Sequence, residues 1–186
     1  DNSTAVTIHS VKDKSLHQLY AKFTPPYGQL FEPQDNFTYI TGLDKAFHVS
    51  RNTLFRVTFQ GCVVNNAGSA LRLYIQIMVN GYLIISNKAV PNTQERVNYG
   101  LGDTILIVDT KNGFYQADTT IGILMPITRI AYIYVAPGVY SFNVGARVES
   151  GRGRVYDSTV TYELMQSEDA DEASLGDFPL VTTFSR

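Results

Sequence analysis

The chain has 186 residues, of which 44% are hydrophobic and 17% charged, and its formal net charge is -2 at neutral pH. This length suits one well-buried core, and no break in composition indicates a second domain. The lysines and arginines are scattered singly, so the basic patch that nucleic-acid binding requires is missing and we expect no nucleic-acid partner. No apolar stretch has the length of a membrane-spanning helix, so we expect no membrane insertion.

The first 36 residues are expected to contribute little regular structure. Alternating apolar and polar side chains predict a short strand over 5–10. Residues 11–36 contain three prolines and several turn residues, and at best 15–20 makes one helical turn. We therefore interpret 1–36 as a strand followed by an arm or long loop of the same domain, wrapped over a sheet edge.

The central part of the chain has the patterns of many short strands. Runs rich in β-branched and aromatic residues, bounded by turn residues, predict strands over 37–40, 46–49, 53–64, 71–79, 82–86, 104–109, 121–127 and 130–135. Asn80-Gly81, between two of these runs, is a strong hairpin signal. Residues 87–99 are interpreted as a polar loop. Pro126 lacks a backbone donor, which places its strand at an edge or a bulge.

Two alternating runs joined by Ser-Gly-Arg-Gly are predicted to pair with each other as a long antiparallel hairpin over 138–165, with one dry and one wet side. The dry side of the second run is expected to contain Tyr156, Val160, Tyr162 and Leu164. The wet side of the hairpin contains Arg147, Glu149, Arg152 and Arg154. We expect this polar side to be solvated; the alternative is that it binds a ligand.

Eight or more strands without a credible long helix predict an all-β fold, a two-sheet antiparallel β-sandwich over 37–166, with jelly roll as the expected topology. Residues 167–186 depart from this pattern. They begin with an acidic linker that cannot form a core of its own and end in a strand-like tail. In that tail, Phe178, Leu180, Thr182 and Phe184 alternate with other residues. We consider two interpretations: a last strand or disordered end of the same subunit, or a strand that pairs with an edge of a neighbouring subunit.

No catalytic or metal-binding motif is present. His9, His17 and His48 are the only histidines, and none lies at metal-ligand spacing from another. Cys62 is the only cysteine, so an internal disulfide is excluded, and we interpret it as a small residue within the strand over 53–64. We therefore expect no enzymatic activity, no cofactor and no metal.

A calcium site is the one metal alternative. Asp109, Asn112 and Asp118 could supply oxygen ligands, but their spacing differs from the helical calcium loop and a turn explains them equally well. Among the aromatic residues, Tyr132, Tyr134 and Tyr140 are expected in the core or in a subunit interface.

Two features suit an exported protein. Asn2 and Asn36 begin Asn-X-Ser/Thr sequons, which are candidate glycosylation sites. The chain begins at Asp1 without an initiator methionine, as a mature form would after removal of a leader, although a trimmed chain would look the same. We expect an extracellular, cell-surface or virion location.

Three stretches resemble the strand pattern of the tumour-necrosis-factor and complement-head jelly-roll superfamily: FRVTFQGCVV, LRLYIQIMVNGYLI and APGVYSFNVGARV. The similar features are aromatic-rich inner strands, the Asn-Gly hairpin and a Pro-Gly-X-Tyr-X-Phe segment at the start of a strand. The resemblance covers about half of the chain, and it implies a homotrimer packed through aromatic faces. It carries over no functional residue.

The expected function is that of a non-enzymatic structural or assembly subunit of an extracellular or virion-associated homo-oligomer, such as a surface fibre, head or shell. Its partners would be copies of itself, in a homotrimer or a polymer, with a cell-surface glycan or protein receptor as a further option. A carbohydrate-binding, lectin-like module is one alternative. A small viral capsid protein is another, against which the lack of a basic RNA-binding arm counts.

Overall fold

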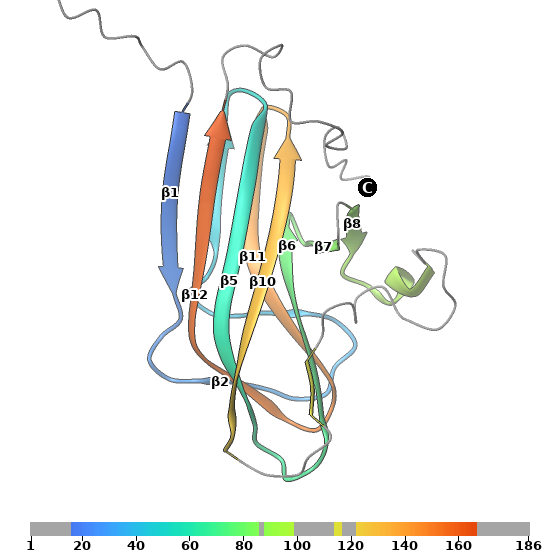
Figure 1. The fold of residues 1–186 in the computed structure, drawn as a ribbon. Helices are drawn as coiled ribbons and strands as arrows, with labels where there is room; N and C mark the ends of the chain where they lie inside the picture. Colours follow the sequence, from blue (N-terminus) through green and yellow to red (C-terminus); the bar gives the residue numbers. More distant parts are fainter. Residues whose placement is uncertain (1–15, 86–87, 99–113, 117–121, 167–186) are drawn as a thin grey trace, which may run out of the picture.

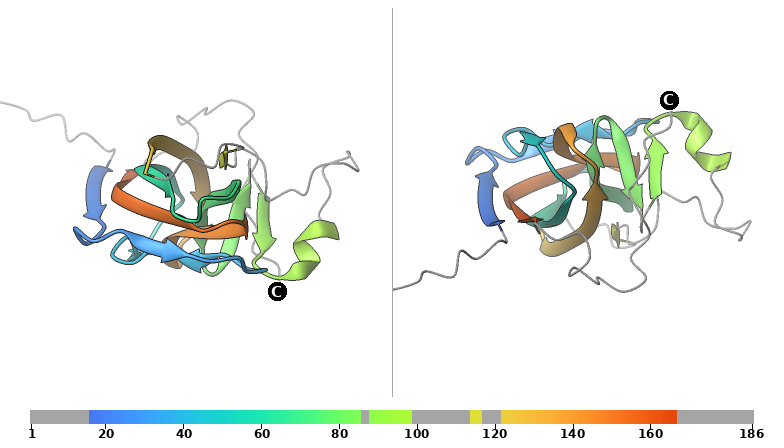
Figure 2. Two further views of the ribbon diagram at one scale, coloured as in Figure 1. Left: turned by 90° about the horizontal axis from the view of Figure 1, so that it is seen from below. Right: turned by 90° about the horizontal axis from the view of Figure 1, so that it is seen from above.

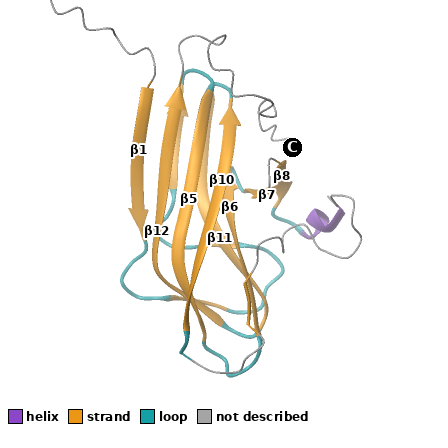
Figure 3. Cartoon of the chain, viewed as in Figure 1, coloured by secondary structure: helices purple, strands orange, loops and turns teal. Residues whose placement is uncertain are grey.

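A computed structural model describes residues 16–85, 88–98, 114–116 and 122–166 of the chain. Two antiparallel sheets pack face to face, which confirms the predicted all-β sandwich (Figure 1). Within these residues the one helical element is a 3-10 helix, η1 (Gln94–Asn98), drawn in purple in Figure 3.

The two sheets are built from strands that are far apart in the chain. The first sheet has the order β1 (Leu16–Phe23), β12 (Gly153–Gln166), β5 (Thr53–Asn65), β10 (Leu124–Val135), with β2 (Gln29–Phe31) also paired to β12. The second has the order β3 (Thr38–Tyr39), β11 (Gly138–Ser150), β6 (Leu71–Val79), β7 (Tyr82–Ile85), β8 (Lys88–Pro91), with β4 (Lys45–Val49) on β11 and β9 (Phe114–Gln116) on β6.

This strand order is a jelly roll. The first and last described strands, β1 and β12, are neighbours, and the chain changes sheets between β4, β5 and β6 and again between β10, β11 and β12. When β3 and β4 are counted as one interrupted strand, the two sheets together have the eight-strand order of a double Greek key. Seen from the ends of the sandwich, β1 lies at one side, while β7, β8 and η1 lie at the other (Figure 2).

The core between the sheets is aromatic at its centre. The rings of Phe47, Phe55, Phe142 and Tyr162 lie 4.6 to 5.6 Å apart between centroids. Tyr162 is fully buried, and its hydroxyl donates a hydrogen bond to the Leu43 carbonyl oxygen at 2.5 Å. Such ring pairs add to the stability that area burial alone provides. The hydrogen bond from Tyr162 joins the loop before β4 to β12.

The strands predicted over 37–40, 46–49, 53–64, 71–79 and 82–86 are confirmed by β3 to β7, except that β3 covers two residues and residue 86 lies outside the described ranges. Asn80 and Gly81 have φ angles of 51° and 82°, as the predicted Asn-Gly hairpin requires. Pro126 lies in β10, an end strand of its sheet, as predicted. The strand predictions for 5–10 and 104–109 lie outside the described residues, as does the tail.

The expected arm contains a strand instead. Residues 16–23 form β1, which pairs with β12 over its whole length, so the expectation of a loop with one helical turn was wrong. β2 also belongs to the first sheet, so the sandwich includes residues before 37. β1 lacks the usual alternation of apolar and polar residues because Leu19 and Phe23 lie on its exposed side, where an edge strand normally has polar residues.

Two further segments were assigned incorrectly. Residues 87–99, predicted to be a loop, contain β8 and η1. The separate strands predicted over 121–127 and 130–135 form the single strand β10. The strand errors have one cause. Pairing of β8 with β7, and of β10 with β5, fixes an extended backbone where the local sequence suggests a turn.

The predicted hairpin over 138–165 was wrong. β11 pairs with β3, β4 and β6, whereas β12 pairs with β1, β2 and β5, so the two strands lie in different sheets. The turn through Gly151, which has a φ of 77°, carries the chain from one sheet to the other. Each strand still turns its apolar side chains to the core, although β11 is buried on both sides over 142–148, and that requirement explains the alternation without any pairing between them.

A bulge in β12 corrects one predicted core residue. After Tyr156 the register with β5 shifts, so that Asp157 and Ser158 both lie opposite Gly61. Asp157 has a φ of 41°, a conformation that a bulge tolerates. As a result Val155 faces the core, and Tyr156, which we expected there, lies on the outer side.

Candidate assembly face

The outer face of the first sheet presents a broad surface made by four strands. Side chains directly opposite each other in adjacent strands share a face. Four rungs cross the sheet from β1 through β12 and β5 to β10: His17, Met165, Leu54 and Tyr134; Leu19, Glu163, Arg56 and Tyr132; Ala21, Thr161, Thr58 and Ile130; Phe23, Thr159, Gln60 and Thr128. We call this surface the assembly face.

Large apolar side chains are concentrated along the two edges of the assembly face. Leu19 and Phe23 on β1 are 65% and 66% exposed, and Leu124, Ile130 and Tyr132 on β10 are also exposed. Ten large hydrophobic side chains are exposed among the described residues, and six of them lie on the outer side of the first sheet: Leu19, Phe23, Leu30, Leu124, Ile130 and Tyr132. The two strands between the edges carry mostly polar residues on this side, whereas Leu54 and Met165 make the middle of one end rung apolar.

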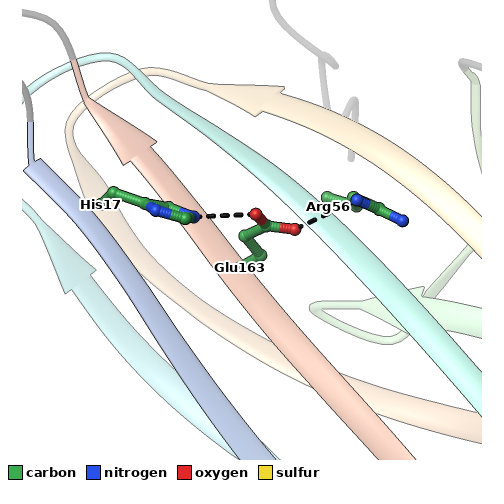
Figure 4. A network of polar contacts seen from close by, with 3 residues as sticks. All are labelled: His17, Arg56 and Glu163. Carbon is green, nitrogen blue, oxygen red and sulfur yellow. Dashed lines mark hydrogen bonds and ion pairs between the residues drawn. The ribbon is translucent and has the colours of Figure 1, made fainter.

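A trio of polar side chains, His17, Glu163 and Arg56, crosses the assembly face from β1 to β5 (Figure 4). The Nε2 atom of His17 on β1 lies 2.8 Å from Oε1 of Glu163 on β12. Arg56 on β5 donates from Nη1 to the other carboxylate oxygen at 3.5 Å. Exposed pairs of this kind contribute little to stability. The Arg56 guanidinium does, however, compensate the charge of Glu163, so that this part of the face can be covered without leaving an isolated carboxylate.

The structure separates the tyrosines that were predicted to lie in the core or an interface. Tyr132 and Tyr134 point to the assembly face from β10. Tyr140 lies on β11 in the second sheet, where its hydroxyl donates to the Ala136 carbonyl oxygen at 2.9 Å. Cys62 is a free, half-buried thiol on β5, in the run predicted for it.

The residues of the assembly face were mostly missed by sequence reasoning. Leu19 and Phe23 were missed because β1 was not recognised as a strand. The available signal was the alternation of Ile130, Tyr132 and Tyr134, which marks one side of β10 as apolar although the opposite side of that strand faces the core. No local pattern shows that β1 and β10, about a hundred residues apart, flank the same sheet.

The polar side expected for the hairpin is not one surface. Arg147 and Glu149 lie on the outer side of the second sheet, Arg152 lies in the turn, and Arg154 lies on the first sheet. Arg147 was expected to be solvated and is buried instead, with its Cζ atom 4.9 Å from the centre of the Tyr74 ring. The physical reason is that a second layer of residues, including Phe37, covers this side of the sheet.

The remaining candidate residues are dispersed. His48 is exposed on β4, away from His17, and His9 lies outside the described residues. Within the described part of the chain, no group of three or more His, Cys, Asp or Glu side chains is arranged to hold a metal ion. The calcium alternative at Asp109, Asn112 and Asp118 lies outside the described ranges.

The sequon at Asn36 is on an exposed segment, where its Oδ1 atom accepts a hydrogen bond from Arg96 at 3.2 Å. The other candidate positions lie outside the described residues: Asn2, Phe178, Leu180, Thr182 and Phe184. In the ranges that the structure describes, no helix has the length and apolar character of a membrane span. No protein-family model matches the sequence, and no curated protein is significantly similar to it.

Proposed function

We propose that the protein is a non-enzymatic structural subunit that assembles with copies of itself through the assembly face. The observation that carries this proposal is the concentration of exposed apolar side chains on one outer sheet face, at Leu19 and Phe23 on one edge and Ile130 and Tyr132 on the other. Large exposed apolar patches are uncommon on monomeric soluble proteins and mark surfaces that another molecule covers.

A second copy of the chain suits this face because the β1 edge and the β10 edge are both apolar but differ in sequence, so one edge can contact the other edge of a neighbour. Contact between the β1 side of one subunit and the β10 side of the next is a head-to-tail arrangement, which closes into a ring when the rotation allows it. The resemblance to the tumour-necrosis-factor and complement-head superfamily supports three copies in that ring. The compensated charge of Glu163 supports burial of the polar middle.

The C-terminal tail offers a second link between subunits. β1 and β10 end the strand order of the first sheet among the described residues, and an end strand presents backbone groups for a further strand. The alternating segment over 178–184 has the composition of such a strand. In this proposal the tail of one subunit pairs with an end strand of its neighbour, and the acidic linker acts as the tether.

The location that fits this role is extracellular, on a cell surface or in a virion, as part of a fibre, head or shell. The two sequons support export. Binding to a glycan or protein receptor is compatible with the same assembly, and a small viral capsid protein is the alternative that shares the jelly roll.

The energetic test of the assembly face is the double substitution of Leu19 and Phe23 by alanine. Full burial of a leucine or phenylalanine side chain contributes about 1.5 to 3 kcal/mol, so covering the two thirds that are exposed contributes about 1 to 2 kcal/mol each. Removing both is expected to weaken each subunit contact by about 2 to 4 kcal/mol, which raises its dissociation constant about 30-fold to 700-fold.

Analytical ultracentrifugation over a range of concentrations measures this change. Val139→Ala is the matched control, because this valine is 67% exposed but lies on β11 in the second sheet. The control is expected to keep the association of the unmodified chain. The proposal is wrong if the double variant retains the same association as well.

A further inference from the structure

A second candidate surface lies on the opposite side of the sandwich. A cavity of about 330 Å³ opens on the outer side of the second sheet, lined by Pro33, Gln34, Asp35, Arg147 and Glu149. Its volume is at the lower end of the roughly 300 to 1,000 Å³ that small-molecule sites occupy. Two of its residues come from β11 and three from the segment between β2 and β3, so distant parts of the chain converge there.

The floor of the cavity contains a rigidly held guanidinium group. Arg147 is only 6% exposed, and its Cζ atom lies 4.9 Å from the ring centre of Tyr74 and 5.8 Å from that of Phe37. Contacts with two aromatic rings hold the guanidinium in one orientation, and its planar geometry is what makes arginine selective.

A carboxylate beside it is fixed in the ionised state. Glu149 is the next residue on the same side of β11; its Oε2 atom accepts a hydrogen bond from the Tyr74 hydroxyl at 2.5 Å, and Oε1 accepts one from Arg72 at 3.2 Å. The Tyr74 bond is the main reason that the pKa of Glu149 is lowered, with smaller contributions from Arg72 and Arg147. The Glu149 side chain is therefore a hydrogen-bond acceptor at neutral pH.

The rim of the cavity is preformed. The backbone N–H of Gln34 donates to the Val148 carbonyl oxygen at 3.0 Å, and the buried Arg96 side chain donates to the Asp35 carbonyl oxygen. Among the described residues, the Asp35 carboxylate accepts a hydrogen bond from Gln94 Nε2 at 2.8 Å. An ionised carboxylate accepts about four, so Asp35 has capacity for further donors. A rim tied down in this way lowers the entropy cost of binding.

We propose that this cavity binds a neutral sugar ring. Its lining places the Arg147 guanidinium beside the acceptors of Asp35 and Glu149, and adjacent sugar hydroxyls can donate hydrogen bonds to these carboxylates. The charges of Arg147 and Arg72 balance those of the two carboxylates, which favours an uncharged ligand over an anion or a cation. Pro33 supplies an apolar wall for the C–H side of a ring.

Saturation-transfer NMR with the full chain tests this proposal. The probes are galactose, glucose, mannose and N-acetylglucosamine, each as the free sugar and as its methyl glycoside. At least one is expected to bind saturably. A response to the methyl glycosides identifies the end of a glycan as the ligand, and a response to the free sugars alone identifies a soluble sugar.

Substitutions then locate the site. Asp35→Asn and Glu149→Gln each replace a charged acceptor by a neutral one and are expected to weaken binding about tenfold. Glu32→Gln is the matched control, since this exposed carboxylate lies close in sequence but does not line the cavity. Circular dichroism checks that the variants fold. Absence of binding by all eight probes, or affinities unchanged in both cavity variants, overturns the proposal.

Discussion

Replacing Tyr162 by phenylalanine tests whether the buried tyrosine stabilises the core as its contacts indicate. The substitution keeps the ring, which lies 5.5 Å from Phe47 and 5.6 Å from Phe142, and removes only the hydroxyl that donates to the Leu43 carbonyl oxygen. Both Tyr162 and Leu43 are fully buried, so water cannot replace the lost donor without rearrangement.

The magnitude follows from the unsatisfied carbonyl group. A buried acceptor that loses its partner costs about 1 to 3 kcal/mol. For a chain of this size each kcal/mol lowers the melting temperature by about 2 to 4 °C, so Tyr162→Phe is expected to melt about 2 to 12 °C below the unmodified protein.

The same residue predicts how this difference changes with pH. Burial, with a smaller contribution from the charge of Asp44, raises the pKa of Tyr162 in the folded state above its ordinary value. Below a pH of about 10 the phenol is neutral in both states, so its contribution to stability is fully present. Above that pH the unfolded chain loses the proton first, and stability falls by up to about 1.4 kcal/mol per pH unit until the pH passes the folded pKa.

Phenylalanine cannot titrate, so the stability difference between the two proteins is expected to narrow by about 1.4 kcal/mol between pH 8 and pH 11. Urea denaturation at both pH values measures the difference. Tyr27→Phe is the control, because this tyrosine is 85% exposed. Equal stabilities at pH 8, or a gap that stays constant to pH 11, would refute the reasoning.

Two further predictions concern the bulge and the tail. Gly61→Ala is expected to destabilise the fold by about 1 to 3 kcal/mol, because the added Cβ would lie 2.2 Å from Ser158 Oγ. The double variant Gly61→Ala, Ser158→Gly should recover part of that loss in a urea titration. A double variant that is no more stable than Gly61→Ala alone would contradict the account of the bulge. Deleting residues 177–186 is expected to leave the β-sheet circular dichroism intact and to dissociate the assembly; an unchanged native mass would show that the tail does not join subunits.

Local patterns predicted the sandwich well where a strand buries one face and ends in a distinct turn. β5 is of this kind. β6 is buried on both sides over 73–79, and its hairpin with β7 was predicted from Asn80-Gly81, which requires positive φ at two successive residues. The alternation in β11 and β12 also predicted strands correctly. It could not predict their partners, because a period of two shows which side is buried and not which strand lies alongside.

The surfaces that matter for function depend on contacts between distant segments. β1 escaped recognition because the assembly face puts apolar side chains where an isolated sheet would be polar. The cavity on the outer side of the second sheet forms because a segment with no strand pattern of its own carries Asp35 over β11, beside Arg147. The Arg147 side chain looked solvated in sequence, since the two rings that cover it come from other strands or loops.

The measurement that tests the central claim most directly is the native mass of the full chain by multi-angle light scattering at several concentrations. The chain has a mass of 20.7 kDa. The proposed assembly predicts a defined multiple of that mass, three subunits if the superfamily resemblance holds, or a polymer. A mass of one subunit at every concentration would contradict assembly through the outer face of the first sheet.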